Sequence, residues 1–345
     1  MKLPYRLAMA AAAAGLVVGG PAMAPAMAAG TPLPAHVYAP YYETYLAPNT
    51  PSITAEAQAS GAKYFSLAFL QATSKGSCSI DWNSNSSQPL SYYNSDIASL
   101  RALGGDVIPT FGGFSADHGG TEIADACTNV NQIAADYEQV ISTLGVTRID
   151  MDVESSSLNN TAGIDRRNKA IALTEQWAAA NGIPLQIQYT IPVEQYGLDP
   201  NGEAVLQNAV ANGVTVNSVN IMVFDYYIAG EGVVNMGQAA INAATNTHTQ
   251  LQSIFPNLTS AQIWNLEGFT MMPGIDDYPK KTEVTHVADA QTMLNFAKAN
   301  NMNFMSIWAI QRDNGGCPGS RGRNTCSGIT QNTWDFSHLL EPFTG

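Results

Sequence analysis

Short apolar runs recur along the chain at intervals of a few tens of residues, and helical patterns fill most of the gaps between them. Runs of this length that are rich in β-branched and aromatic residues predict strands. Strands that alternate with helices predict a parallel sheet covered by helices. The eight expected strands are His36–Tyr45, Tyr64–Ala72, Asp106–Gly113, Arg148–Glu154, Leu185–Pro192, Val219–Tyr226, Ile263–Phe269 and Met305–Asp313.

The clearest helical pattern lies between the third and fourth predicted strands. Ile133, Tyr137, Val140, Ile141 and Leu144 recur on one helical face, and Gly145 follows as a C-cap residue would. Eight strands alternating with helices predict the α/β class and a (β/α)8 TIM barrel. Residues 29–345 are expected to form one domain, since no linker-like segment interrupts them. The other predicted helices are Gly163–Ala180, Gly202–Ala211, Gly237–Ile254 and Val287–Ala299.

The N-terminus has the pattern of a secretory signal peptide. Lys2 and Arg6 precede an apolar stretch from Leu7 to Val18, and Ala26-Met27-Ala28 fits the small-residue cleavage rule. Cleavage after position 28 would leave 345 − 28 = 317 residues. No later apolar run approaches the ~20 residues of a membrane helix. We therefore expect a secreted, extracellular protein that does not enter a membrane.

The charge and composition of the chain indicate which classes of molecule it can bind. The 15 Lys and Arg residues face 28 Asp and Glu residues, so the net charge is −13, and loss of Lys2 and Arg6 with the signal would make it −15. Nucleic-acid binding is disfavoured, because neutralising phosphates needs a basic surface. With 45% hydrophobic and 12% charged residues, the chain has enough apolar side chain for a large core. A monomer is expected.

Four cysteines occur in a chain predicted to enter an oxidising compartment. Two disulfides are favoured over four free thiols, and the pairing that closes local loops is Cys78 with Cys127 and Cys317 with Cys326. The five histidines lie far apart and show no paired metal-binding spacing. No metal site and no cofactor are expected.

The fourth predicted strand reads Arg148-Ile149-Asp150-Met151-Asp152-Val153-Glu154. Because side chains alternate along a strand, the three acids share one face, and the apolar residues between them share the other. The apolar face would pack against the outer helices, so the acids would line the barrel interior. Burial and mutual repulsion raise carboxyl pKa values, which suits a general acid. A solvated edge strand or a calcium site would explain the same row of acids.

The acid row resembles the D-x-x-D-x-D-x-E motif on the fourth strand of the glycoside hydrolase family 18 chitinases. Phe111-Gly112-Gly113 resembles the family's S-x-G-G region. The segment Met222 to Tyr226 resembles its M-x-x-D-Y motif, and Ser306-Ile307-Trp308 resembles the region of its eighth-strand tryptophan. The order and spacing of the motifs agree over nearly the whole chain after position 28.

The resemblance implies hydrolysis of β-1,4 bonds between N-acetylglucosamine units with retention, in which the acetamido group of the substrate acts as nucleophile. Glu154 would be the general acid and base. Asp152 would orient the acetamido group and stabilise its developing positive charge. Asp150 would share a proton with Asp152.

The resemblance also implies substrate-binding residues. Trp308 would form an apolar floor beneath the sugar. Met222, Asp225 and Tyr226 would line the acetamido pocket. The weaker candidates, each with an alternative as packing residues, are Tyr41, Gln188 and Tyr189.

Two positions depart from the family pattern. Thr147 stands at the first Asp of the acid motif, and Phe224 stands where many members have the tyrosine that binds the acetamido oxygen. If the protein is an enzyme, Tyr226 or a side chain of the fifth strand would take over that binding.

Two other functions fit the same motifs. Relatives that lack the acid are non-catalytic chitin-binding lectins, and related endo-β-N-acetylglucosaminidases cleave N-glycans with the same pair of acids. Aromatic residues that could stack on chitin are Tyr92, Tyr93, Trp82 and Trp264. The segment between the seventh and eighth strands has room for one loop and one helix, which predicts an open cleft and endo-acting cleavage. Gly315 to Gly328 is expected to be a disulfide-stapled surface loop near the end of the eighth strand.

Overall fold

The computed structural model describes residues 32–226, 234–277, 282–320 and 324–345. The predicted signal peptide lies outside these ranges, as do three residues of the predicted loop 315–328. The strands are β1 Val37–Tyr38, β2 Tyr41–Glu43, β3 Tyr64–Ala72, β4 Ile80–Trp82, β5 Asp106–Gly112, β6 Arg148–Asp152, β7 Gln186–Pro192, β8 Val216–Met222, β9 Glu267–Met271, β10 Gly274–Ile275, β11 Val284–Thr285 and β12 Phe304–Ile307. The helices are α1 Ile53–Ser60, α2 Asn94–Ala102, α3 Phe114–Gly119, α4 Ile123–Ala126, α5 Val130–Leu144, α6 Thr161–Ala180, α7 Pro200–Ala211, α8 Met236–Ile254, α9 Ser260–Trp264, α10 Val287–Asn300 and α11 Asp335–Leu340.

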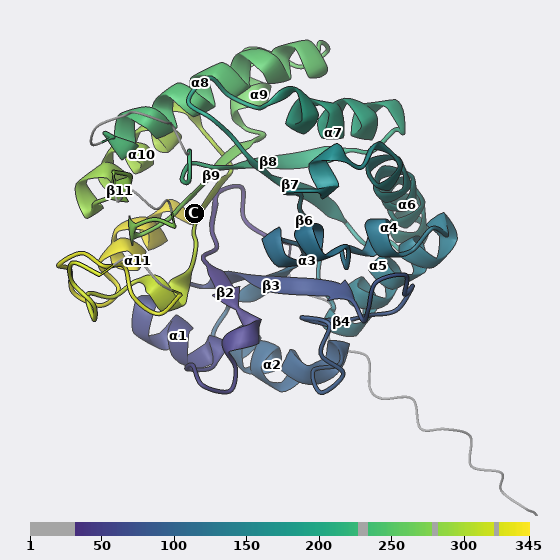
Figure 1. Ribbon diagram of the computed structural model, residues 1–345, viewed down its shortest axis with the longest axis horizontal. Coiled ribbons are helices and arrows are strands. Elements are labelled where there is room, and N and C mark those ends of the chain that lie inside the picture. Colours follow the sequence, from purple (N-terminus) through teal and green to yellow (C-terminus); the bar gives the residue numbers. More distant parts are fainter. Residues whose placement is uncertain (1–31, 227–233, 278–281, 321–323) are drawn as a thin grey trace, which may run out of the picture.

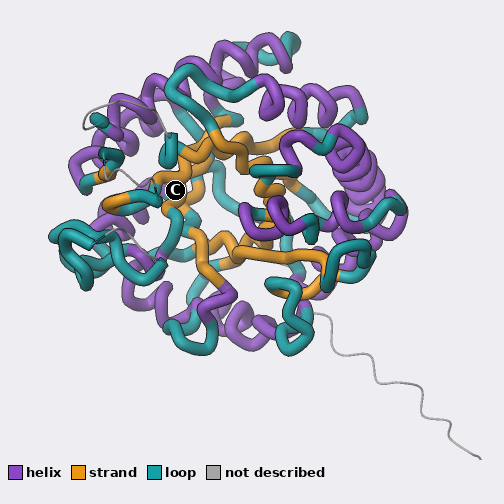
Figure 2. Tube along the Cα trace, viewed as in Figure 1, coloured by secondary structure: helices purple, strands orange, loops and turns teal. Residues whose placement is uncertain are grey.

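The main sheet curls into a ring inside a layer of helices (Figures 1 and 2). Its strand order is β1-β12-β9-β8-β7-β6-β5-β3-β2, and every neighbouring pair on this path is parallel. The two ends of the path, β1 and β2, are consecutive in the chain. Together they occupy one strand position, so the sheet closes into a barrel with eight strand positions. The predicted (β/α)8 fold is confirmed.

The first strand position is divided between β1 and β2 at Ala39 and Pro40. The Ala39 N–H donates to Met305 O at 3.0 Å, whereas Pro40 O accepts from the Ser66 N–H at 3.1 Å. Proline has no N–H to donate, so the chain leaves one neighbour here and joins the other. The predicted strand 36–45 is therefore two short strands.

Several other strand predictions differ at their ends. Ile263 lies in α9, which Thr259 and Gln262 begin as a capping box, so β9 starts only at Glu267. β12 ends at Ile307, and residues 310–312 form a 3-10 turn instead of extending the strand. β8 begins three residues earlier than predicted and ends at Met222.

The five predicted helices are confirmed as α5, α6, α7, α8 and α10, each within three residues of its expected start. The short helices α3 and α4 were not predicted. They contain six and four residues. Segments of this length have too few turns to show a helical period.

The apolar core lies between the sheet and the helices. Ile149, Met151 and Val153 are buried in it beside Tyr137 of α5. The barrel interior is more polar, since Asp150, Gln188 and Asn220 are fully buried there. Polar side chains therefore lie inside the barrel, and the apolar packing that stabilises the fold lies between the sheet and the helices.

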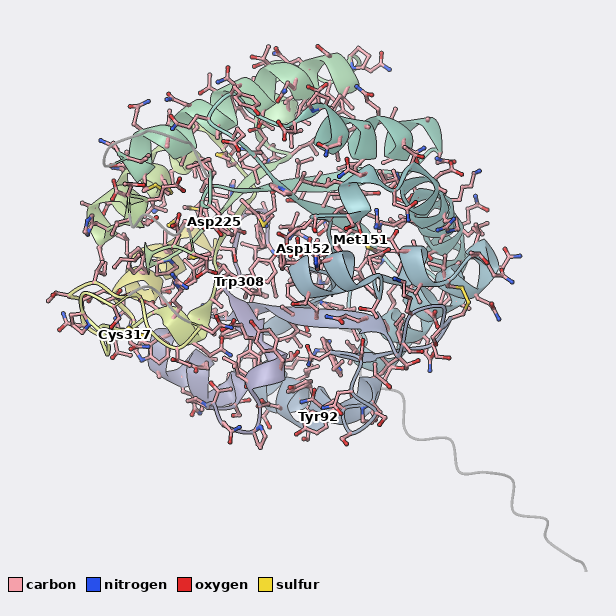
Figure 3. All side chains as sticks on the ribbon, in the orientation of Figure 1. Tyr92, Met151, Asp152, Asp225, Trp308 and Cys317 are labelled. Carbon is pink, nitrogen blue, oxygen red and sulfur yellow. A yellow bond between two sulfur atoms is a disulfide. The ribbon has the colours of Figure 1, made fainter. Side chains whose placement is uncertain are left out.

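Both predicted disulfides are present. Cys78 pairs with Cys127, with Cα atoms 4.7 Å apart, and Cys317 pairs with Cys326 at 6.0 Å. Figure 3 shows Cys317 at the periphery, while Asp152, Asp225 and Trp308 lie toward the centre of the ring. None of the described helices combines the length and the apolar character needed to cross a bilayer.

Candidate active site

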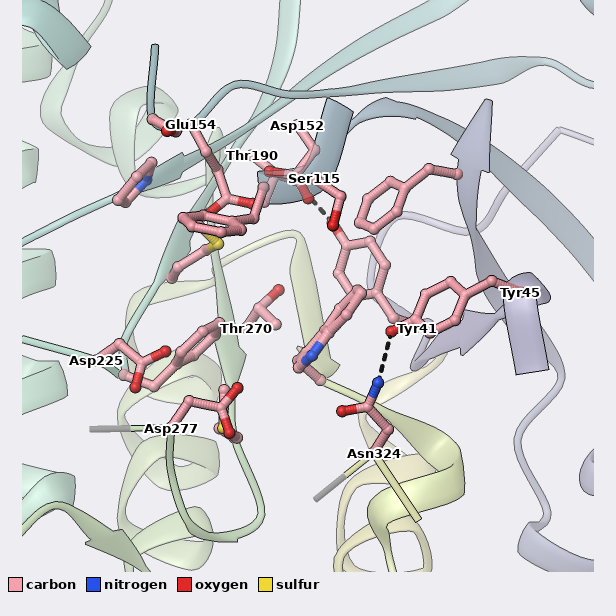
Figure 4. A pocket seen from close by; sticks show the side chains of 18 of the residues that line it. Tyr41, Tyr45, Ser115, Asp152, Glu154, Thr190, Asp225, Thr270, Asp277 and Asn324 are labelled. Atoms are coloured by element: carbon pink, nitrogen blue, oxygen red, sulfur yellow. Dashed lines mark hydrogen bonds between the residues drawn. The ribbon is translucent and has the colours of Figure 1, made fainter. Parts of the chain in front are cut away.

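A cavity of about 760 Å³ opens at the carboxyl ends of the barrel strands (Figure 4). This is the end at which (β/α)8 barrels place their chemistry. Its lining combines carboxyl, hydroxyl, amide, aromatic and aliphatic side chains. The lining residues are Tyr41, Tyr45, Phe69, Gln71, Asn83, Phe114, Ser115, Asp152, Glu154, Ser155, Thr190, Pro192, Met222, Phe224, Asp225, Thr270, Met272, Asp277, Trp308 and Asn324.

Strand β6 directs its acids into the barrel. Asp150 pairs in register with Thr110 on one side and Gln188 on the other, and Asp152 pairs with Gly112 and Thr190. Asp150 is fully buried and Asp152 is 3% exposed. The alternation predicted from the sequence is therefore present, and it excludes a solvated edge strand.

Asp150 is held by a set of hydroxyl groups. Tyr41 and Thr110 donate to its Oδ2 at 2.8 and 3.1 Å, and Thr190 donates to its Oδ1 at 2.8 Å. Burial raises the pKa of Asp150 to about 6, although these hydrogen bonds oppose the rise. Asp150 is thus fixed in place below the cavity and does not line it.

Asp152 differs from Asp150 in its hydrogen bonding. Its Oδ1 is buried and receives no hydrogen bond from any described residue. Burial, and then the charges of Glu154, Asp150 and Asp117, raise its pKa well above the usual range. A buried carboxyl with an unpaired oxygen favours its protonated form.

Glu154 follows the end of β6 and reaches the cavity, where it is partly buried. Its backbone N–H donates to Asp117 Oδ2 at 2.6 Å. Burial raises the pKa of the Glu154 carboxyl to about 7, and a hydrogen bond from the Phe114 backbone opposes the rise. A carboxyl that keeps a substantial protonated fraction near neutral pH can act as a general acid.

Aromatic side chains form another wall of the cavity. The ring of Trp308 is stacked on Phe69, with centroids 5.4 Å apart and planes inclined by 22°. Trp308 also contacts Tyr41 at 5.4 Å. The stack gives the indole a fixed orientation at the cavity surface.

The end of β8 and the residues that follow it line the cavity on a different side from Asp152 (Figure 4). Met222, Phe224 and Asp225 line the cavity. The Asp225 backbone N–H donates to Asp276 Oδ2 at 3.1 Å. Burial, and then the charge of Asp276, raise the pKa of Asp225 to about 8.

Tyr226 is placed differently from the sequence-based expectation. It is 1% exposed, packs in the outer core and does not line the cavity. Its backbone N–H donates to Glu283 Oε2 at 2.8 Å. The Tyr226 hydroxyl is therefore not placed to replace a tyrosine at position 224, whereas the neighbouring Asp225, whose φ is 51°, does line the cavity.

The two strand-five candidates also lie away from the cavity. The Tyr189 hydroxyl donates to Asn168 of α6 at 2.7 Å, on the outer side of the sheet. Gln188 faces the interior, but it lies at the level of Asp150 and accepts a bond from Arg148 at 3.5 Å. The residues of this strand that do reach the cavity are Thr190 and Pro192.

The proposed stacking residues do not gather at the cavity either. Trp82 is fully buried and donates to Leu90 O at 3.2 Å, with its ring edge-on to Tyr93. Trp264 stacks on His248. Tyr92 is exposed at the periphery in Figure 3.

Several cavity residues were missed by the sequence interpretation. Phe114 and Ser115 follow the Gly112-Gly113 pair, which was a signal that pointed to this loop. Tyr45 and Asn324 come from opposite ends of the chain and are joined by an Asn324 to Tyr45 hydrogen bond of 2.9 Å. No sequence pattern connects two residues so far apart. Within the described ranges, no group of three His, Cys, Asp or Glu side chains is arranged to hold a metal ion.

The chain is similar in sequence to known proteins. No family model matches the chain. A probable bifunctional chitinase/lysozyme of Escherichia coli is 32% identical over 91% of this chain, and endochitinase 11 of Metarhizium anisopliae is 33% identical over 82%. The chain spans only 36% and 54% of the lengths of these two relatives.

A solved structure completes the comparison. The catalytic domain of the hyperthermophilic chitinase from Pyrococcus furiosus superposes with a TM-score of 0.78 and 28% identity, over 90% of this chain and 96% of that domain. The chain is therefore similar in sequence and in fold to proteins named chitinases. In this barrel, Asp152 of β6 and Glu154, which follows β6, line the cavity together with Trp308, which follows β12.

Proposed function

We propose that this protein is a secreted chitinase that cleaves β-1,4 bonds between N-acetylglucosamine units with retention of configuration. The proposal is supported by the named relatives and by the cavity chemistry. One observation carries it most directly: Glu154, with its pKa raised to about 7, lines the same cavity as Asp152 and Trp308.

In the proposed mechanism, Glu154 protonates the glycosidic oxygen and the carbonyl oxygen of the substrate's acetamido group attacks the anomeric carbon. The products of this step are the released chain end and a cyclic oxazolinium ion. Glu154, now ionised, then removes a proton from the water that opens this ion. The protein carboxylates never bond to the sugar, which distinguishes this route from the usual retaining mechanism.

Asp152 would orient the acetamido N–H and balance the positive charge of the oxazolinium ion. Its Oδ1 has no hydrogen-bond donor among the described residues, so the side chain is available for that contact. Asp150 is already saturated by hydroxyl donors and would instead exchange a proton with Asp152. Preorganised charge of this kind stabilises a transition state without reorganisation.

Trp308 would support the apolar face of the distorted sugar, since its ring is immobilised by Phe69. Met222 and Asp225 would bound the acetamido pocket. With Tyr226 turned away, we infer that Tyr41, Thr190, Thr270 or Asp225 supplies the polar contacts there, because these polar groups line the cavity. We further propose endo-acting cleavage by a monomer.

The test is turnover of N-acetylglucosamine oligosaccharides by the protein and by Glu154→Gln. The substitution preserves shape and removes the transferable proton, so we expect kcat to fall by about 10³-fold or more, with substrate binding retained. Glu138→Gln on the outer helix α5 is the matched control and should remain active.

Two results would contradict the proposal. Turnover by Glu154→Gln at more than a tenth of the unmutated rate would exclude Glu154 as the acid. Binding of oligosaccharides by the unmutated protein without any cleavage would indicate a lectin, or an enzyme to be tested on N-glycans.

A further inference from the structure

A buried polar layer lies behind Glu154, outside the cavity. Asp117 of α3 is 1% exposed, and it does not line the cavity. It faces the loop that follows β6. Nothing in the proposed mechanism uses this side chain, although a buried carboxyl is costly unless it serves a partner.

The partner of Asp117 is the main chain of the acid itself. Its Oδ2 accepts the Glu154 N–H at 2.6 Å, whereas its Oδ1 receives no hydrogen bond from the described residues. The carboxyl is packed against β5, because a Cβ added at Gly112 would lie 3.2 Å from Asp117 Oδ1 and 2.2 Å from Asp152 O. Asp117 thus lies directly against the end of the acid strand.

This contact completes a series of three along the backbone. The Gly113 N–H donates to Asp152 O at 3.1 Å, and the Val153 N–H donates to Thr190 O at 2.9 Å. The Glu154 N–H is the next donor in line, and no strand neighbour accepts it. Asp117 supplies the missing acceptor at the residue where the strand has ended.

The layer behind Asp117 holds it in place. The Asp117 N–H donates to Gly113 O at 3.0 Å. Arg167 of α6 is buried and pairs with Glu122 at 3.0 Å, and its charge opposes the rise in the pKa of Asp117 caused by burial and by Glu122. The contact to Glu154 is therefore part of a fixed structure and not a surface encounter.

We propose that Asp117 is a positioning residue that fixes the backbone of Glu154 and thereby aims its carboxyl at the glycosidic oxygen. This inference rests on the proposed function. Asp117 touches neither the substrate nor the reacting atoms. A displacement of about 1 Å at a catalytic group can cost about 100-fold in rate, so loss of the acceptor should be seen in kcat more than in binding.

The test compares Asp117→Ala with Asp117→Asn on an N-acetylglucosamine oligosaccharide. The alanine variant loses the acceptor, and we expect kcat to fall about 10- to 100-fold while KM stays within about threefold. The asparagine variant keeps a carbonyl oxygen for the Glu154 N–H, whether or not the native carboxyl is ionised. It should recover kcat to within about threefold of the unmutated protein.

Asp136→Ala, at a buried acid of α5 remote from the cavity, controls for the general effect of removing a buried carboxyl. It should leave kcat unchanged. If Asp117→Ala fails to fold, Asp117→Asn decides alone, and a kcat below a tenth of the unmutated value would overturn the proposal.

The unmutated protein, assayed in parallel, separates the two proposals. An inactive unmutated protein would overturn the proposed function. An active one with an equally fast Asp117→Ala, or with an asparagine variant as slow as the alanine variant, would overturn the role of Asp117.

Discussion

Two carboxyls on one strand acquire different chemistry from their immediate contacts. Asp150 is bound by three hydroxyl donors and its pKa rises only to about 6. Asp152 has an unpaired oxygen and two acidic neighbours in the row, and burial together with these charges raises its pKa well above the usual range. Hydrogen bonds stabilise the charged form, and burial and like charges destabilise it. The roles therefore follow from the neighbours and not from the residue type.

The pKa of Glu154 gives a prediction for the pH dependence of turnover. The proposed acid step needs the protonated carboxyl, and burial raises the pKa of Glu154 to about 7. Raising the pH through that value removes the proton, so kcat/KM should decline above about pH 7. Because the site is coupled to Asp152, the midpoint is that of the pair.

The measurement is kcat/KM between pH 5 and pH 9, with oligosaccharide binding measured over the same range. A kcat/KM that already falls about tenfold per pH unit from pH 5 would show that the pKa of the acid is not raised, and a constant kcat/KM up to pH 9 would show that no group with a pKa near 7 controls turnover. A decline that follows loss of binding would point to another group.

At the scale of elements, the end of β5 determines where β6 can lie. Gly112 and Gly113 have φ values of 94° and 81°, a left-handed region that glycine adopts without strain. A Cβ at Gly113 would also lie 2.5 Å from the Phe69 ring that supports Trp308. The pair thus permits close contact with both the acid strand and the aromatic wall.

We expect Gly112→Ala to destabilise the fold by about 3 kcal/mol or more, because backbone strain adds to a clash with Asp152 O. Gly104→Ala is the matched control. Its φ of 84° is similar, but nothing lies within 4 Å of the added Cβ, so the cost should be only about 1 kcal/mol. Urea denaturation of both variants measures the difference, and equal costs would show that the clash is relieved elsewhere.

For the molecule as a whole, buried carboxyls link stability to pH. Burial raises the pKa of Glu43 to about 8 and those of Glu56 and Asp136 to about 7. The folded state therefore holds protons that the unfolded chain releases near pH 4. Between about pH 4 and pH 8 the folded state binds more protons, so the free energy of unfolding falls as pH rises. The net charge of −13 adds repulsion in the same direction.

Thermal unfolding should accordingly show a higher midpoint at pH 5.5 than at pH 8. Glu43→Gln isolates one site, because Glu43 is fully buried with an unpaired Oε2 and the amide cannot ionise. Its stability relative to the unmutated protein should improve between pH 5.5 and pH 8. Glu138→Gln is the comparison: burial also raises the pKa of Glu138, but this residue is partly exposed, so its variant should show a smaller pH response. Equal responses of the two variants would refute the assignment.

Much of the fold could be predicted because its signals are local. The apolar periods of α5, α8 and α10 and the alternating row of β6 are properties of adjacent residues. The errors occurred where the tertiary contacts decide, as at Pro40, where one predicted strand changes partners, and at Ile263, where a capped helix replaces a strand. Periodicity cannot report a change of neighbour.

The candidate site divides in the same way. The sequence alone determined that Asp150, Asp152 and Glu154 share one face and that Trp308 belongs to the region of the last strand, because alternation and motif order are fixed by the covalent chain. Only the tertiary structure decided that Tyr189 points to α6, that Tyr226 leaves the cavity, and that Asp117 accepts the Glu154 N–H. These positions depend on how barrel closure and loop packing bring residues together that are distant in the sequence. No local sequence pattern specifies which of these residues come into contact.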